Sequence, residues 1–181
     1  MLELNFEPFP IIVTDRLVLR KISMNDVEDV FELRTNEEAM KYINRPRPKS
    51  IAEVEELITK MNDISARINW AITLKTEDRI IGIIGYHIIE KTNYRAEIGY
   101  MLHPKYWNTG MMSEAISGVI NYGFTNMGLH SIEARINPAN TQSSKILLKH
   151  SFNKEGYFKE NFFFDGVFMD SEIYSLLKSR V

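Results

Sequence analysis

The chain has 181 residues and a formal net charge of −2, with 44% hydrophobic and 25% charged residues. These values are typical of one globular domain with a substantial core, which we expect to span residues 1–181. They exclude a global positive field that would recruit nucleic acid or an anionic membrane, so neither is expected as a partner.

Cysteine is absent, which excludes disulfides, thiolate catalysis and cysteine-ligated zinc. The N-terminus lacks the basic-then-apolar layout of a signal peptide. The most apolar stretch, Ile80–Ile89, is too short to cross a bilayer, so we expect a cytoplasmic protein. His103, His130 and His150 are scattered without metal-ligand spacing, and we expect no metal.

The first third of the chain predicts a strand followed by helices. Arg16–Arg20 alternates polar and apolar residues, as strands do. Ser23 with Asp26 is a short version of the capping box, and the apolar spacing after it predicts one helix or two short ones. Ser50 with Glu53 is a second capping pair, which opens a helix over residues 51–61.

A proline-broken loop, Asn44–Lys49, lies between these helices and carries Arg45, Arg47 and Lys49. Two interpretations stay open for this basic cluster. We favour a solvated loop, and the alternative is a site for a polyanion.

The apolar period then changes to that of strands, with turn residues between the segments. The elements expected from here on are an antiparallel meander of three strands, a helix, a strand, a helix and two closing strands joined by a hairpin turn at Asp165-Gly166: Asn69–Leu74, Ile80–Ile89, Arg95–Leu102, Ser113–Met127, Ser131–Ile136, Thr141–Lys149, Tyr157–Phe164 and Met169–Ser175.

These elements predict an α+β domain around one central, mixed and mostly antiparallel sheet of about seven strands flanked by helices. Trp70, Tyr86 and the aromatic run Phe162–Phe164 are expected in its core or in the walls of a substrate groove.

The segment Trp107–Ala115 carries the strongest functional signal. It follows the predicted strand that ends at Leu102 and leads into an apolar-periodic helix. The first turn of a helix has unpaired backbone N–H groups and a positive dipole end, and Gly110 would let the backbone approach an anion closely. The segment therefore predicts an anion site, for a phosphate above all.

Four segments in order resemble the GNAT N-acetyltransferase superfamily, in the branch of the ribosomal-protein N-terminal acetyltransferases. They are Thr14–Arg20, Glu97–Leu102, Tyr106–Ala115 and Asn137–Ser143, and the resemblance covers nearly the whole chain.

The resemblance implies a sheet that splays between its fourth and fifth strands and holds acetyl-CoA there. The opened backbone near Tyr100, Met101 and Leu102 would pair with the pantetheine arm. The superfamily pattern Gln/Arg-x-x-Gly-x-Gly/Ala falls on Trp107, Gly110 and Met112, and only the glycine matches. Backbone N–H groups would do most of the pyrophosphate binding. The cofactor-binding loop implied in this way consists of Trp107, Asn108, Thr109, Gly110, Met111, Met112 and Ser113.

Asn140 and Ser143 resemble the Asn-x-x-Ser of this branch. The resemblance implies that Asn140 binds the pantetheine and that Ser143 lies near the thiol. Alternatively, Asn140 caps the following helix and Ser143 lies in its first turn, and both interpretations can hold together.

Acetyl transfer to an amine needs a neutral amine, a donor for the thioester oxygen as it becomes an oxyanion, and a proton for the departing thiolate. Glu97 is the first candidate for the base, and the alternative is a surface carboxylate paired with Arg95 or Arg135. Ser143 competes with Tyr157 for the acid role. A backbone N–H near Met101 or Leu102 is the expected oxyanion donor.

The sequence thus predicts an acetyl-CoA-dependent N-acetyltransferase that acts on a primary amine, with a protein or peptide N-terminus as the leading acceptor. A small-amine acetyltransferase (polyamine, amino acid or antibiotic) and a non-catalytic acyl-CoA-binding module are the alternatives. Glutamates near the predicted helix over residues 51–61 keep a polyamine acceptor open. A homodimer could form through the aromatic segment Tyr157–Tyr174.

Overall fold

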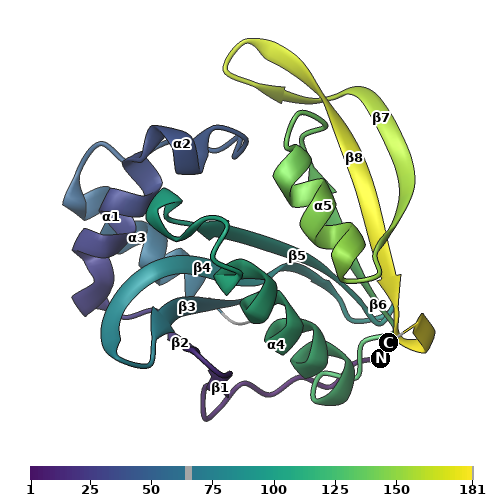
Figure 1. Cartoon of the computed structure of the whole chain (residues 1–181), viewed down its shortest axis with the longest axis horizontal. Coiled ribbons are helices and arrows are strands. Elements are labelled where there is room, and N and C mark those ends of the chain that lie inside the picture. The colour runs from purple at the N-terminus through teal and green to yellow at the C-terminus, as the bar shows by residue number, and fades with distance from the viewer. Residues whose placement is uncertain (64–66, 181) are drawn as a thin grey trace.

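A computed structural model describes residues 1–63 and 67–180 of the chain, which fold around one eight-stranded sheet (Figure 1). The strand order is β1-β2-β3-β4-β5-β6-β8-β7. The strands are β1 Ile12–Val13, β2 Leu17–Lys21, β3 Ile68–Leu74, β4 Glu77–Glu90, β5 Arg95–Leu102, β6 Ser131–Ile136, β7 Asn153–Phe164 and β8 Val167–Leu177. The helices are α1 Val27–Thr35, α2 Glu37–Met40, α3 Ile51–Met61, α4 Met111–Thr125 and α5 Thr141–Lys149, with 3₁₀ turns at Met24–Asp26, Pro104–Tyr106 and Lys178–Arg180.

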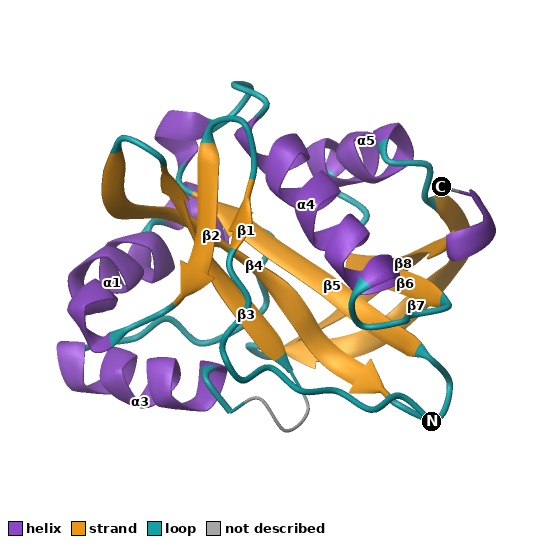
Figure 2. Cartoon of the chain, turned by 90° about the horizontal axis from the view of Figure 1, so that it is seen from below, coloured by secondary structure: helices purple, strands orange, loops and turns teal. Residues whose placement is uncertain are grey.

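The helices lie on both faces of the sheet, which is strongly twisted (Figure 2). One core is built from the inward residues of α4 and of the strands, with Trp70 and Tyr86 fully buried as expected. A second core joins α1 and α3 to the opposite face, through residues such as Val30, Ile58 and Met101. No helix in the described residues is long and apolar enough to cross a membrane.

The sheet opens between β5 and β6. Every other neighbouring pair is antiparallel, whereas these two strands are parallel and pair over three residues only, Arg95–Glu97 with Ser131–Glu133. β5 continues to Leu102, where it still pairs with β4. The α+β class and the splay between the fourth and fifth predicted strands, here β5 and β6, are therefore confirmed.

Most predicted elements are confirmed, and β6 and α5 begin and end at the predicted residues. The sheet contains one further strand, β1, because two residues are too few to show an alternating pattern. The helical region after Ser23 forms two helices, since Asn36 ends α1 and its side chain caps α2 by accepting from the Ala39 N–H.

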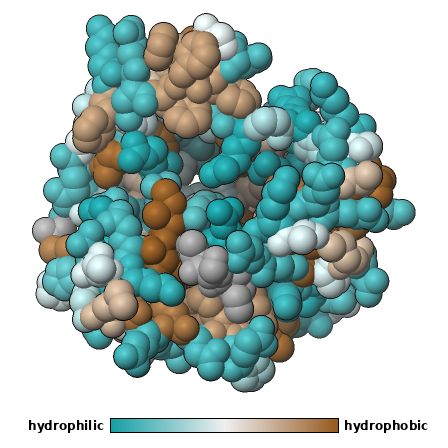
Figure 3. Space-filling model, turned by 180° about the vertical axis from the view of Figure 1, so that it is seen from behind, coloured by the Kyte–Doolittle hydropathy of each residue, from teal (hydrophilic) through white to brown (hydrophobic). Residues whose placement is uncertain are grey.

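The hairpin of β7 and β8 extends beyond the rest of the sheet (Figure 1). Asp165 and Gly166 have φ angles of 49° and 80°, which confirms the two-residue turn. Phe162 and Phe163, expected in the core or in the walls of a substrate groove, are 39% and 59% exposed and therefore lie outside the core. Figure 3 shows apolar side chains gathered at the top of its view, the end at which Figure 1 places this hairpin. A homodimer through this face stays a prediction.

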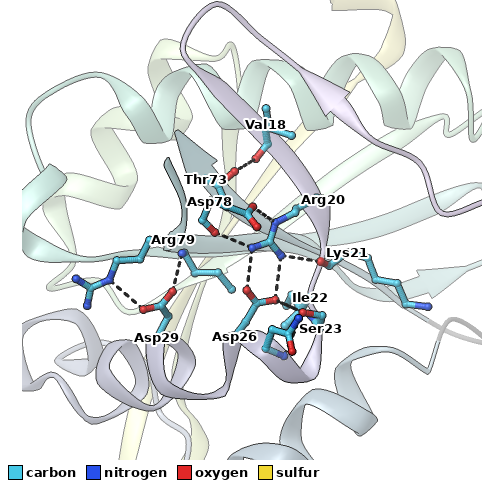
Figure 4. A network of polar contacts seen from close by, with 12 residues as sticks. Val18, Arg20, Lys21, Ile22, Ser23, Asp26, Asp29, Thr73, Asp78 and Arg79 are labelled. Atoms are coloured by element: carbon cyan, nitrogen blue, oxygen red, sulfur yellow. Dashed lines mark hydrogen bonds and ion pairs between the residues drawn. The ribbon is translucent and has the colours of Figure 1, made fainter. Parts of the chain in front are cut away.

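A polar network fastens the start of α1 to the edge of the sheet (Figure 4). The buried Asp26 carboxylate accepts two hydrogen bonds from Arg20, at 2.9 and 2.8 Å, and one from the Ser23 N–H at 2.7 Å. The predicted capping box is therefore confirmed, and it is extended by a salt bridge to β2. Although burial opposes ionisation, Arg20 and Ser23 together hold the pKa of Asp26 below its ordinary value.

Asp26→Asn is expected to lower the free energy of unfolding by about 2–3 kcal/mol at pH 7, because it leaves the Arg20 charge without its buried partner. The depressed pKa means that the carboxylate contributes above its unfolded pKa of about 3.9, and that this contribution disappears as the pH falls through the lower folded value. Urea unfolding at pH 7 and at pH 3 measures both effects. Asp78→Asn is the matched control, since Asp78 also binds Arg20 but is 84% exposed and should contribute less than about 1 kcal/mol.

Candidate active site

The opening between β5 and β6 leads into a cavity of about 500 Å³. Its walls come from β5, from the loop before α4, from the first turn of α4, from the length of α5, and from α2 with the residues after it. Among the predicted site residues, those that line the cavity are Tyr100, Met101, Leu102, Trp107, Asn108, Gly110, Met112, Ser113, Asn140 and Ser143. The structure thus brings together ten predicted residues from three segments of the chain.

The loop before α4 has the geometry of an anion cradle. Asn108 and Gly110 adopt left-handed backbone angles, with φ of 60° and 82°. The first helical hydrogen bond runs from the Glu114 N–H to the Gly110 carbonyl at 3.0 Å. The N–H groups of Met111, Met112 and Ser113 therefore precede the intrahelical ladder, at the positive end of a 15-residue helix. These residues fit a pyrophosphate, although Met111 itself does not line the cavity.

Trp107 has a structural role that the superfamily pattern does not predict. Its indole Nε1 donates to the Leu102 carbonyl at 2.8 Å, which ties the loop back to the end of β5. Thr109 also fastens the loop, because its hydroxyl donates to the Tyr106 carbonyl at 2.6 Å. Thr109 does not line the cavity, so its predicted contact with the cofactor stays a prediction.

Arg16, which the sequence did not single out for this site, lies against the loop. Its Nη1 donates to the Thr109 carbonyl at 3.0 Å, and its Nε pairs with Glu114 at 2.7 Å. Glu114 also accepts from the Thr14 hydroxyl at 2.5 Å. Burial opposes ionisation of Glu114, but these donors hold its pKa below the ordinary value. The carboxylate at the start of α4 is thus neutralised by its partners, and a cation stands beside Gly110.

The open edge of β5 offers backbone groups to an extended ligand. The His103 N–H donates to the Ile81 carbonyl at 2.8 Å, toward β4, whereas the Leu102 carbonyl accepts from Trp107 on the other side. Backbone groups alternate sides along a strand, so the N–H groups of Leu102 and Tyr100 point toward the opening. The expected oxyanion donor is therefore Leu102 or Tyr100, and the Met101 N–H points toward β4.

Tyr100 and Ser143 form a hydrogen-bonded pair in the cavity, with 2.8 Å between their hydroxyl oxygens. Burial raises the pKa of Tyr100 to about 12, although the bond to Ser143 opposes this. Asn140 caps α5, since its side-chain oxygen accepts from the Ser143 N–H at 3.1 Å. The amide NH₂ of Asn140 can still donate to a ligand, so both interpretations of this residue are compatible.

Glu97 does not line the cavity. It lies three residues before Tyr100, about 10 Å along the strand. Its carboxylate is 3.9 Å from the Arg135 Nε, and burial raises its pKa despite that neighbour. A basic role for Glu97 therefore requires an acceptor that enters from the α1–α3 side, or an intervening water.

His87 lies beside Glu97 on the same face of the sheet. A Cβ atom at Gly99 would lie only 2.2 Å from the His87 Nε2, so the imidazole covers this glycine of β5. Burial and the nearby charges of Arg45, Arg67 and Arg34 lower the pKa of His87 to about 4, and the ring is neutral at pH 7. The sequence did not predict His87, because only the pairing of β4 with β5 brings it to the site.

One further prediction concerns a residue outside the cavity. Tyr157 is 51% exposed on the hairpin, and its hydroxyl donates to Asp170, so the structure does not bring this candidate acid to the site.

Lys145 and Lys149, which the sequence did not single out, line the cavity from successive turns of α5. Their spacing of four residues on one helix face is the signal that could have revealed them.

Residues 16–153 match the acetyltransferase (GNAT) domain family. The chain belongs to this family. It is 36% identical over 175 residues to the uncharacterized N-acetyltransferase YoaA of Bacillus subtilis, with 95% of this chain and 99% of that protein covered. A GNAT-family acetyltransferase from Bacillus anthracis has a similar crystal structure, with a TM-score of 0.85, 30% identity, and coverage of 94% of this chain and 99% of that one.

More distant relatives have different acceptors in their names. The spermidine N(1)-acetyltransferase of Vibrio cholerae is 24% identical over 168 residues, covering 93% of this chain and 96% of that protein. The ribosomal-protein-serine acetyltransferase of Escherichia coli is 30% identical over 99 residues, covering 55% of each protein. This GNAT protein is thus an acetyl-CoA-dependent N-acetyltransferase.

Proposed function

We propose that this N-acetyltransferase acetylates the α-amino group of a peptide or protein N-terminus. The observation that carries the proposal is the weakness of the bases on the acceptor side, the partly buried Glu97 and the neutral His87. An α-amino group, with a pKa of about 8, is partly neutral at pH 7 and needs only such a base, whereas a lysine at about 10.4 needs a stronger one. The ribosomal-protein relative supports this acceptor class.

In this proposal the loop and the open strand edge hold acetyl-CoA, which supplies the activated acetyl group. The N–H groups of residues 108–113 bind the pyrophosphate, and Lys145 and Lys149 add positive charge around it, while Arg16, paired with Glu114, supports the loop. The backbone of Tyr100 and Leu102 pairs with the amides of the pantetheine arm, and Asn140 donates to it. The thioester is thereby placed at the Tyr100–Ser143 pair.

The chemical step then needs the nitrogen to lose two protons and the thiolate to gain one. Glu97, directly or through a water, takes the proton from the ammonium, and the amine attacks the acetyl carbon while the Leu102 or Tyr100 N–H stabilises the oxyanion. As the C–N bond forms and the C–S bond breaks, the nitrogen loses its second proton to water, Ser143 donates a proton to the thiolate, and Tyr100 reprotonates Ser143 and then regains a proton from water. The raised pKa of Tyr100 keeps its proton available at pH 7.

The test is coenzyme A release, together with the mass of the product, for peptides with free or blocked N-termini and for spermidine. We expect acetylation of free α-amino groups and no reaction of peptides whose only amine is a lysine side chain. Transfer to spermidine but to no peptide would favour the small-amine alternative.

A further inference from the structure

Three arginines gather on the face of β4 and β5 that α1 and α3 cover, where the acceptor is proposed to enter. Arg34 of α1, Arg45 of the loop after α2, and Arg67 before β3 all act on His87, whose pKa they lower. The Arg34 Nη1 is also 4.0 Å from the sulfur of Met101, a residue that lines the cavity. Three segments of the chain thus bring positive charge to the same face of β4 and β5.

These cations lack the partners that arginines have elsewhere in the fold. Arg20, Arg79 and Arg95 each bind two carboxylates. Within residues 1–63 and 67–180, by contrast, no ion pair joins Arg34 or Arg45 to a carboxylate, and the buried Nε atoms of Arg34 and Arg67 have no hydrogen-bond acceptor.

The cluster of Arg34, Arg45 and Arg67 costs free energy when no anion is bound. Burial, and then repulsion by Arg45, lower the pKa of Arg34 to about 10, so the guanidinium is still charged at pH 7. A partly buried cation without a counterion costs free energy, and so does an unpaired buried N–H. The Glu97 carboxylate interacts electrostatically with Arg135 more than with Arg45, and Glu133 binds Arg95. An anion brought by a ligand would offset this cost.

We infer that the acceptor is an anionic amine, whose carboxylate or phosphate is bound by Arg34 with Arg45 and Arg67 while its amine faces the cavity. This deepens the proposed function and rests on it. A guanidinium matches the paired oxygens of either anion, which explains arginines rather than lysines here. The sequence favours a solvated loop around Arg45, whereas in this proposal the same loop is part of an anion site.

The same charges oppose a polyamine acceptor. A polycation would have to approach three arginines across a partly buried surface, where like charges repel strongly. The glutamates that left this acceptor open lie elsewhere: Glu55 and Glu56 are exposed on α3, and Glu53 accepts from the Lys49 N–H. None of the three lines the cavity.

The test uses matched dipeptide amides, Ser-Asp, Ser-phosphoSer, Ser-Asn and Ser-Lys, together with free glutamate, phosphoethanolamine and spermidine. We expect kcat/KM to be at least tenfold higher for an anionic acceptor than for its neutral counterpart. The ranking of aspartyl against phosphoseryl peptide, and of glutamate against phosphoethanolamine, distinguishes a carboxylate from a phosphate.

Arg34→Met should raise KM for the anionic acceptor tenfold to a hundredfold, with little change for Ser-Asn-amide and none in the affinity for coenzyme A. Arg45→Met, at an exposed loop position that cannot unfold the core, should act in the same direction. Lys60→Met is the matched control, because it removes one positive charge from an exposed site on α3.

Two results would overturn the inference outright, and a third would overturn it while the proposed function stands. One is a preference for Ser-Lys-amide or spermidine, and the other is an Arg34→Met effect that is equal for anionic, neutral and cationic acceptors. Acetylation of the neutral peptide alone would overturn the anionic acceptor and leave the proposed function standing. Transfer to glutamate or phosphoethanolamine but to no peptide would overturn the proposed function and leave the anionic acceptor standing.

Discussion

Gly110→Val is expected to weaken coenzyme A binding by about a hundredfold or more while the protein stays folded. Gly110 has a φ of 82°, which a β-branched residue adopts only at a cost, and a Cβ atom would lie 3.3 Å from the Arg16 Nη2. The loop would have to move, and with it the N–H groups that we propose bind the pyrophosphate. The loss of one or two charge-assisted hydrogen bonds accounts for a change of this size. Titration calorimetry with coenzyme A measures it.

Gly166→Val is the matched control for this change. Gly166 has nearly the same φ, 80°, but lies in the turn between β7 and β8, where a Cβ atom would meet nothing within 4 Å. Both variants should lose some thermal stability from backbone strain. Only Gly110→Val should lose affinity, and wild-type affinity in that variant would remove the loop from the cofactor site.

Glu97→Gln is expected to lower kcat/KM for a peptide acceptor by about a hundredfold at pH 7, the size typical of a lost general base. The raised pKa of Glu97 means that the basic form appears only above that pKa, so wild-type kcat/KM should rise as the pH passes through it. In the variant the amine must already be neutral. The deficit should therefore shrink above pH 8, where most α-amines have lost their proton.

The pH profile separates this role from a merely structural one. Glu133→Gln is the control, because Glu133 pairs with Glu97 in the register of β5 and β6 but binds Arg95. It should change kcat/KM less than about threefold. If His87→Gln rather than Glu97→Gln produced the large, pH-dependent loss, His87 would be the base.

Much of the fold could be predicted because its signals are local. Ser23 with Asp26, Asp165-Gly166 and the strict alternation of Arg16–Arg20 each act over a few residues, and the structure confirms all three. β1 has too few residues to show a pattern. Phe162 and Phe163 lie outside the core because three adjacent aromatics cannot all face one side of a strand, and the hairpin extends past the helices that would cover them.

Most residues that line the cavity could be predicted for the same reason. Residues 107–113 and 140–143 are contiguous in sequence, and the structure brings most of them to one cavity with Tyr100. The proposed acceptor side could not be predicted, because it is assembled from α1, the loop after α2, and β4. Arg34 and His87 meet only through tertiary packing, and no spacing in the sequence relates them.

A crystal structure with bound coenzyme A would test directly whether the opening between β5 and β6 holds the cofactor. We expect the pyrophosphate at the N–H groups of residues 108–113, the pantetheine arm along Tyr100 and Leu102, and the sulfur within reach of the Ser143 hydroxyl. Coenzyme A bound outside the opening between β5 and β6, or with its sulfur far from Tyr100 and Ser143, would contradict it.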